Sequence, residues 1–290
     1  MDHALTVPRV ITSTLIAAAL LALGSPALGL SCGDMVTTST TLTADLTGCA
    51  GNGLVVDADN ITIDLAGFKI AAAGGNTSSG ITDGATSRPG AQILNGTITG
   101  FQSGINLAAS VRSVVEGMRV IANGTGTAVG VGDGSIVRNN LVDGNGGPGI
   151  AAGAGALVTG NAAFGNGGAA ITVGVGGLVS GNAAKLNSGA GISAGNGSTV
   201  RANTATGNNS GISVGLHSRV NDNTTSLNLG NGISTGINAT VNENTSSGNG
   251  GIGIAVVCPS LLIGNGSRSN GGGNLVETGD ARCKKFNNMF

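Results

Sequence analysis

The residues best suited to chemistry are five ionisable side chains in the second half of the chain: Arg201, His217, Arg219, Asp222 and Glu243. Asp222 and Glu243 are 21 residues apart, so a fold that stacks them would create a carboxylate pair. Retaining glycosidases use two carboxyl groups about 5 Å apart, and a polysaccharide lyase needs a base beside a cation that neutralises an acidic sugar. These five residues are therefore the candidate catalytic group.

A repeat of about 21 residues between positions 135 and 270 supplies the stacking that this group requires. Two asparagine columns share the spacings 21, 21, 21, 20, 21 and 21, and an isoleucine column keeps the same register. The first column is Asn140, Asn161, Asn182, Asn203, Asn223, Asn244 and Asn265. The second column is Asn145, Asn166, Asn187, Asn208, Asn228, Asn249 and Asn270. Such self-similarity indicates a repeat protein.

Each repeat contains three short stretches that are too short and too glycine-rich for helices. Apolar residues recur at every second position, as in Ile150 with Ala152 and Ile171 with Val173, which predicts strands. We therefore expect an all-β solenoid, with three strands per coil and coils stacked in parallel about 4.8 Å apart. The asparagines are expected to form structural ladders that bond the coils above and below and to adopt the left-handed backbone of the corners.

The candidate site allows two interpretations, one catalytic and one structural. Arg201 and Arg219 point outward on adjacent coils, where they either meet an acidic sugar or keep the sheet surface soluble. Asp222 and Glu243 fall in one column, where a cation or arginine would relieve their repulsion. They lie at a strand end beside an asparagine corner, where a cleft is not expected. That position favours a structural pair over a catalytic one.

The composition agrees with stacked coils. The chain has 290 residues with 55 glycines, 2% aromatic residues and no Trp or Tyr, so a core of large side chains is not available. Its 40% apolar content and strict register argue against disorder. With a net charge of −1, the sequence lacks the basic surface that nucleic-acid binding requires.

The N-terminus is typical of an export signal. An apolar run at 10–23 and small residues at 26–29 predict a signal peptide at 1–30, with no stable membrane insertion after its removal. Export makes disulfides favourable, and local pairing at each end of the stack predicts the bonds Cys32–Cys49 and Cys258–Cys283. The remaining chain, 31–290, is expected to form one domain with irregular coils at 31–134, regular coils at 135–270 and a cap at 271–290.

The opening coils carry motifs that resemble a known superfamily. Cys32-Gly-Asp, Leu42-Thr-Ala-Asp-Leu46, Ile61-Thr-Ile-Asp-Leu65-Ala-Gly67 and Asn95-Gly-Thr-Ile98 look like the first coils of secreted bacterial right-handed parallel β-helix proteins of the pectin-lyase-like superfamily. The asparagine ladders look like its generic repeat. The resemblance implies a right-handed parallel β-helix over the mature chain. Its functional implication is broad, because the superfamily includes lyases, hydrolases, epimerases, tailspikes and adhesins.

The function we expect is a non-catalytic β-helix, secreted, periplasmic or on the cell surface, whose polar surface binds a glycan or another partner. The alternative is an extracellular polysaccharide lyase, hydrolase or epimerase. We expect no cofactor for the first and calcium only if the protein is a lyase. We also expect a monomer. Catalytic members usually have long loops that wall a cleft, and here the Gly-, Ser- and Thr-rich stretch 71–90, read as a loop, is the candidate for such a wall.

Overall fold

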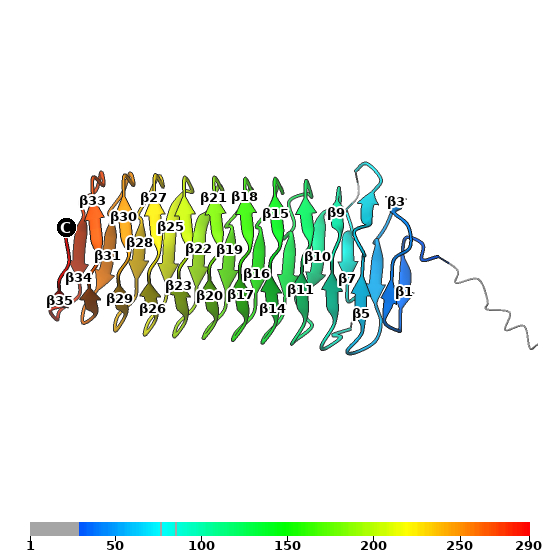
Figure 1. Cartoon of the computed structure of the whole chain (residues 1–290), viewed down its shortest axis with the longest axis horizontal. Coiled ribbons are helices and arrows are strands. Elements are labelled where there is room, and N and C mark those ends of the chain that lie inside the picture. Colours follow the sequence, from blue (N-terminus) through cyan, green and yellow to red (C-terminus); the bar gives the residue numbers. More distant parts are fainter. Residues whose placement is uncertain (1–28, 76, 85) are drawn as a thin grey trace, which may run out of the picture.

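The computed structural model describes residues 29–75, 77–84 and 86–290, which form 35 strands and no helix. The strands build three long parallel sheets that run along one elongated solenoid (Figure 1). Sheet A contains β1 (Asp34–Val36), β4 (Leu54–Val56), β7 (Ser79–Thr82), β10 (Ser103–Leu107), β13 (Val129–Val131), β16 (Ile150–Ala152), β19 (Ile171–Val173), β22 (Ala190–Ala194), β25 (Ser210–Val214), β28 (Ile233–Thr235), β31 (Ile254–Val257) and β34 (Leu275–Thr278).

Sheets B and C follow the same order, because each coil contributes one strand to each sheet in turn, except that the last coil contributes only β34 and β35. Sheet B contains β2 (Thr40–Thr41), β5 (Thr62–Asp64), β8 (Gln92–Leu94), β11 (Val114–Glu116), β14 (Ile136–Arg138), β17 (Leu157–Thr159), β20 (Leu178–Ser180), β23 (Thr199–Arg201), β26 (Arg219–Asn221), β29 (Thr240–Asn242), β32 (Leu261–Ile263) and β35 (Lys284–Phe286). Sheet C contains β3 (Leu46–Cys49), β6 (Lys69–Ala72), β9 (Thr97–Thr99), β12 (Arg119–Ile121), β15 (Leu141–Asp143), β18 (Ala162–Phe164), β21 (Ala183–Lys185), β24 (Thr204–Thr206), β27 (Thr224–Ser226), β30 (Thr245–Ser247) and β33 (Gly266–Arg268).

The core consists of small and branched side chains stacked in columns. In sheet B the central residue of each strand from β5 to β32 points inward, and Val137, Val158, Val179, Val200 and Val220 are all fully buried and in register. This stack confirms the predicted all-β solenoid with three strands per coil. It also explains the composition, because each inward column is only one side chain wide and is filled by small and branched residues, with Phe101 as the one aromatic side chain buried in the core of the described residues.

Both asparagine columns form the predicted ladders. The Oδ1 atom of Asn203 accepts hydrogen bonds from the backbone N–H and from Nδ2 of Asn182, at 2.9 and 3.0 Å. Its own Nδ2 donates to the carbonyl oxygen of Val179 and to Oδ1 of Asn223, both at 3.0 Å. Each buried amide therefore connects three successive coils, and the second column repeats this pattern from Asn123 to Asn270.

The expected backbone of the ladder asparagines is wrong in one respect. The left-handed residue at each corner is the one before the ladder asparagine: Ala202 (φ 54°) precedes Asn203, and Gly207 (φ 68°) precedes Asn208. The reason is that the side-chain amide of the ladder asparagine must point into the stack to bond its neighbours. The left-handed backbone of the preceding residue bends the chain so that the asparagine side chain takes this direction. Asp222 and Glu243 are such preceding residues, with φ of 57° and 54°.

Both ends of the solenoid carry the expected disulfides, Cys32–Cys49 and Cys258–Cys283. Residues 271–290 continue the coil, because β34 and β35 pair with β31 and β32. Within this last coil Glu277 and Lys285 occupy the positions of buried Val256 and Leu262 in the coil before, and they form a 2.7 Å ion pair. A charged pair in place of core residues covers the end of the apolar interior and discourages further strand pairing.

Two further expectations concern the N-terminal part. Stretch 71–90 is not one long loop, because β7 lies within it and pairs with β4 and β10, so its loops on either side are short. The predicted signal peptide lies almost wholly outside the described residues, which begin at 29. In the described part of the chain, no helix has the length and apolar character needed to cross a membrane.

Candidate functional site

Asp222 and Glu243 lie on adjacent coils, at the corner where sheet B ends and sheet C begins. Both side chains are exposed. Their backbone N–H groups donate to the carbonyl oxygens of Asn242 and Ile263 in the following coils, at 3.0 and 2.9 Å. The same corner position is Ala202 one coil earlier and Gly264 one coil later. The two carboxylates therefore stand on a convex edge of the solenoid.

The structure stacks these carboxylates but does not join them to a cation. Within the described residues, neither Asp222 nor Glu243 takes part in an ion pair. The side chain of Glu243 extends toward the next coil, since its Cγ would lie 3.3 Å from a β-carbon placed on Gly264. Glu243 thus leans away from Asp222, and the pair has neither the bridging arginine nor the enclosing walls expected of a catalytic dyad.

The basic residues of the candidate group are spread over sheet B. Arg201 and Arg219 point outward from adjacent strands β23 and β26, but Arg201 pairs with Asn221 and Arg219 with Thr199, so they are out of register by two residues. His217 is exposed at the corner before β26, with φ 57°, whereas Asp222 follows that strand. Strand β26 therefore separates the histidine from the carboxylates.

Sequence reasoning missed a regular polar surface on sheet C, which we call the hydroxyl grid. It consists of Thr204 and Thr206 on β24, Thr224 and Ser226 on β27, and Thr245 and Ser247 on β30. The first residue of each strand is exposed and the third is half-buried, and the strands pair in register. The Thr206 and Ser226 hydroxyls lie 3.0 Å apart and share a hydrogen bond. In the sequence, the grid could have been found from Thr or Ser on both sides of a small inward residue in each of the three strands.

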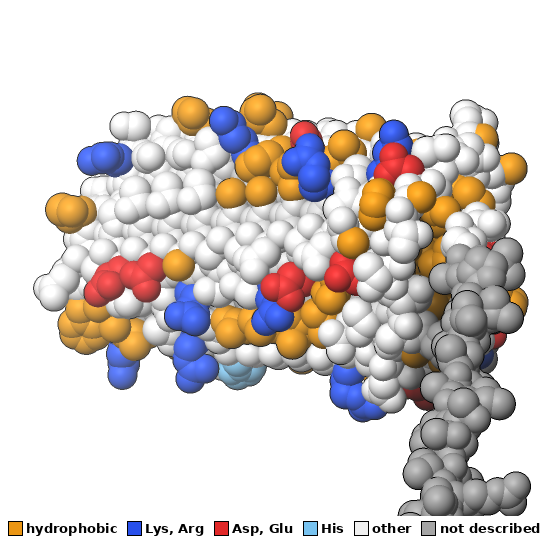
Figure 2. Space-filling model, turned by 45° about the vertical axis from the view of Figure 1, so that its right-hand side comes forward, with side chains coloured by type: hydrophobic (Ala, Val, Ile, Leu, Met, Phe, Trp, Pro, Cys, Tyr) orange, Lys and Arg blue, Asp and Glu red, His pale blue; other side chains and the backbone are white. Residues whose placement is uncertain are grey.

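The hydroxyl grid is bordered by residues of several kinds. Lys185 and Arg268 continue its second column at the two ends, and both are exposed. Asp222 and Glu243 lie along the sheet B side, and exposed Leu227 lies along the sheet A side. Elsewhere, too, charged and hydrophobic side chains are scattered, and Figure 2 shows wide areas without either on one face of the molecule. The grid is thus an uncharged area with mixed borders.

A second polar group that the sequence did not reveal lies in the irregular coils. The buried hydroxyl of Ser110 donates to the buried carboxylate of Asp83 at 2.7 Å and accepts a bond from the backbone N–H of Arg88. Arg88 in turn forms an ion pair with Asp57. These contacts fasten the segment after β7 across the neighbouring coils, which is a structural role.

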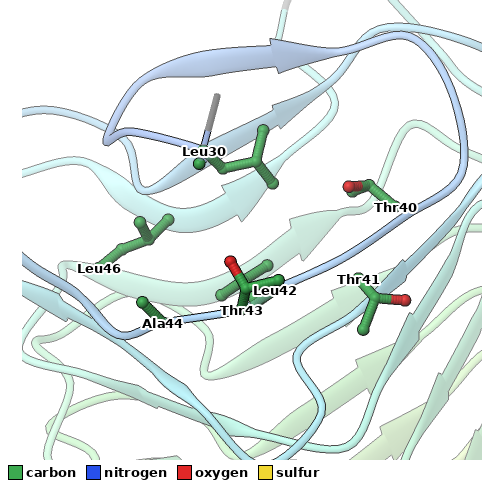
Figure 3. A pocket seen from close by; sticks show the side chains of 8 residues that line it. Leu30, Thr40, Thr41, Leu42, Thr43, Ala44 and Leu46 are labelled. Atoms are coloured by element: carbon green, nitrogen blue, oxygen red, sulfur yellow. The ribbon is translucent and has the colours of Figure 1, made fainter. Parts of the chain in front are cut away.

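Neither Asp222 nor Glu243 lines any of three recesses on the described surface. One of about 100 Å³ opens at the N-terminal end between Leu30, Leu42 and Leu46 (Figure 3). One of about 410 Å³ lies at the C-terminal end of the hydroxyl grid, lined by Thr245, Arg268 and Phe290. One of about 310 Å³ lies beside Arg282. In the parts of the chain that the structure describes, no group of three or more His, Cys, Asp or Glu side chains is arranged to hold a metal ion.

Comparison with known proteins places this architecture in a family. Residues 38–184, which are just over half of the 290, match the family described as the right handed beta helix region. The chain belongs to the right-handed β-helix family. No curated protein matches its sequence.

Solved structures with the same fold are distant in sequence. The A-module of mannuronan C-5 epimerase AlgE6 from Azotobacter vinelandii superposes with a TM-score of 0.60 at 18% identity, over 89% of each chain. The periplasmic alginate epimerase AlgG gives 0.57 at 14% identity, over 88% of this chain and 76% of that one. A mutant tailspike protein of E. coli bacteriophage HK620, in complex with a pentasaccharide, gives 0.55 at 12%, over 89% and 59%. At these identities the likeness establishes the fold alone.

Proposed function

We propose that the protein is a non-catalytic, glycan-binding β-helix that works outside the cytoplasm, as a secreted, periplasmic or cell-surface protein. The observation that carries this proposal is the hydroxyl grid, where three neighbouring strands present six hydroxyl groups outward in register. Hydroxyl groups both donate and accept hydrogen bonds, as the hydroxyls of a sugar do. Each grid hydroxyl can therefore act as donor or as acceptor to a glycan. The grid is the binding surface in this proposal.

Three further observations support it. The fold relatives include a mannuronan C-5 epimerase, an alginate epimerase and a tailspike in complex with a pentasaccharide, so this scaffold accommodates saccharides in other proteins. The two terminal disulfides suit an oxidising compartment. The exposed position of Asp222 and Glu243 on a convex corner gives a sugar no enclosed site where water is excluded and charge is stabilised.

The alternative, a polysaccharide lyase, hydrolase or epimerase, makes different demands. It requires Asp222 and Glu243, with Arg201 or Arg219, to converge on one sugar, and a calcium ion would be sought only if that enzyme were a lyase. The loop at 71–90 that was expected to wall a cleft is interrupted by strand β7, which is part of sheet A. The binding proposal needs neither convergence nor a wall.

A combined binding and product assay tests the proposal. The protein is incubated with a panel of neutral and acidic polysaccharides, and binding, unsaturated products, new reducing ends and epimerised residues are measured. We expect binding without any product, and binding that Glu243→Gln leaves unchanged within a factor of about two, as for Asp143→Asn, a control that neutralises another exposed carboxylate. A product made by the wild type and abolished by Glu243→Gln would establish the enzyme instead.

A further inference from the structure

We infer that the hydroxyl grid recognises an ordered, uncharged polysaccharide surface, in which sugar units repeat at fixed spacing in two dimensions, and not a single dissolved acidic chain. The inference rests on the proposed glycan-binding function and narrows its ligand class. Three properties of the grid carry it: regular geometry, rigidity and the balance of charge around it.

The geometry of the grid is two-dimensional. Thr204 pairs with Thr224 and Thr224 with Thr245, so one column runs along the solenoid axis, and Thr206, Ser226 and Ser247 form the second. Neighbouring strands are about 4.8 Å apart, and residues i and i+2 of a strand are about 6.7 Å apart. The Cα atoms that carry these hydroxyls therefore stand at the corners of nearly equal rectangles, and in the second column the Thr206 and Ser226 hydroxyls turn toward each other to share their hydrogen bond. A partner that satisfies all six must itself repeat in both directions.

The grid is also held rigid on both sides. Each of its strands begins directly after an asparagine of the first ladder and ends two residues before one of the second, as β27 does between Asn223 and Asn228. Both asparagines are almost fully buried and bonded to the coils before and after. A preorganised surface loses little conformational entropy when it binds a rigid partner. A flexible dissolved chain loses conformational entropy when it is ordered on the surface, and this loss weakens its binding.

Charge argues for an uncharged partner. No grid residue is ionisable, and Lys185 and Arg268 at its ends are balanced by Asp222 and Glu243 along one side. The four bordering charges sum to zero, so a polyanion gains no net attraction there, and it meets repulsion along the first column, which lies next to the carboxylates. An uncharged glycan meets no such repulsion.

The modest strength of each contact explains why order matters. The six grid residues include no aromatic side chain, and Phe290 lies only in the recess beside Thr245 at the C-terminal end of the grid. A single hydrogen bond at a solvent-exposed site contributes little net affinity. Among the described residues, the side chains of Thr204, Thr224 and Thr245 form no intramolecular hydrogen bond, so all three hydroxyls are free to bond a ligand. Useful affinity then requires many weak contacts made together, which an ordered surface supplies through multivalency.

The test compares solid and dissolved forms of glycans. The full chain is mixed with microcrystalline cellulose, crystalline chitin, soluble cello-oligosaccharides and soluble alginate, and the bound fraction is measured. We expect binding to a crystalline neutral solid at least about tenfold tighter than to the soluble ligands. The triple variant Thr204→Val, Thr224→Val, Thr245→Val keeps shape and removes three hydroxyls, and it should weaken that binding about tenfold or more. Thr199→Val with Thr240→Val on sheet B is the matched control and should change nothing.

The outcomes separate this inference from the proposed function. Binding to alginate or oligosaccharides in preference to both solids overturns the inference and leaves glycan binding standing. Equal binding by the triple variant and the wild type also overturns it, provided that their melting temperatures agree, because the grid is then not the contact surface. Absence of binding to every glycan overturns both proposals.

Discussion

Replacing Asn203 with Leu in the middle of the stack tests what the ladders contribute. Leucine has a similar volume but no polar atoms, so the backbone N–H of Asn182 loses its acceptor at 2.9 Å, and the carbonyl oxygen of Val179 loses a donor. Asn203 is only 1% exposed, so water cannot replace these partners without a rearrangement. A buried donor left without a partner costs about 1–3 kcal/mol, which is the destabilisation we expect.

The assay is urea unfolding followed by circular dichroism, with Asn209→Leu as the matched control. Asn209 follows the next ladder asparagine, its side chain is exposed, and the equivalent residue one coil later is Leu229, so leucine already fits that column. The control should lie within about 0.5 kcal/mol of the wild type. Equal unfolding free energies for the two variants would refute the reasoning, because the ladder amides would then add nothing beyond the strand pairing.

The other predictions concern the corners and the ends. Gly181→Ala should destabilise the protein by about 1 kcal/mol, because φ is 66° there and the added carbon meets no atom within 4 Å, so only backbone strain changes. Glu243→Gly should raise the melting temperature or leave it unchanged, since the next coil already has glycine at that corner, and a clear loss of stability would mean that the carboxylate has a structural partner. Replacing Cys258 and Cys283 with serine should cost about 2–4 kcal/mol and speed amide exchange in β34 and β35 before the central coils; unchanged exchange would contradict the capping role.

Much of the fold was predictable because the chain repeats itself. A fixed period places equivalent residues in one column, so the ladders and the inward valines follow from counting. The terminal disulfides followed from the export signal and from the positions of the cysteines at the two ends. Asn203 and Asn223 illustrate this, since their spacing alone predicts that they bond each other. Where the period breaks, the sequence no longer predicts the strands. Strand β7 lies in a polar stretch that was predicted to be a loop, and its pairing with β4 and β10 is what identifies it as a strand.

The candidate site was less predictable, because the repeat tells which residues stack but not the shape of the surface that they form. Asp222 and Glu243 do share a column, yet their left-handed backbone and their convex corner depend on how the chain aims the following asparagine into the stack. The hydroxyl grid went unrecognised for a related reason. Thr and Ser are common in any polar segment, and only the registration of β24, β27 and β30 turns six of them into a surface.

The corners also explain why function is better sought on the sheet faces of this protein. A left-handed corner residue projects its side chain away from the stack and along the edge, as Leu186 does over Gly207 and Leu227 over Gly248. Such side chains, ionisable or apolar, stand on ridges, and in the described part of the chain no long loop closes over the corners after sheets B and C. The residues that share a plane are the outward ones of each strand, which the ladders hold at fixed positions. A solenoid with short corners therefore offers its partners a regular face, and the uncharged face over β24, β27 and β30 is the most regular polar one in the C-terminal half of sheet C.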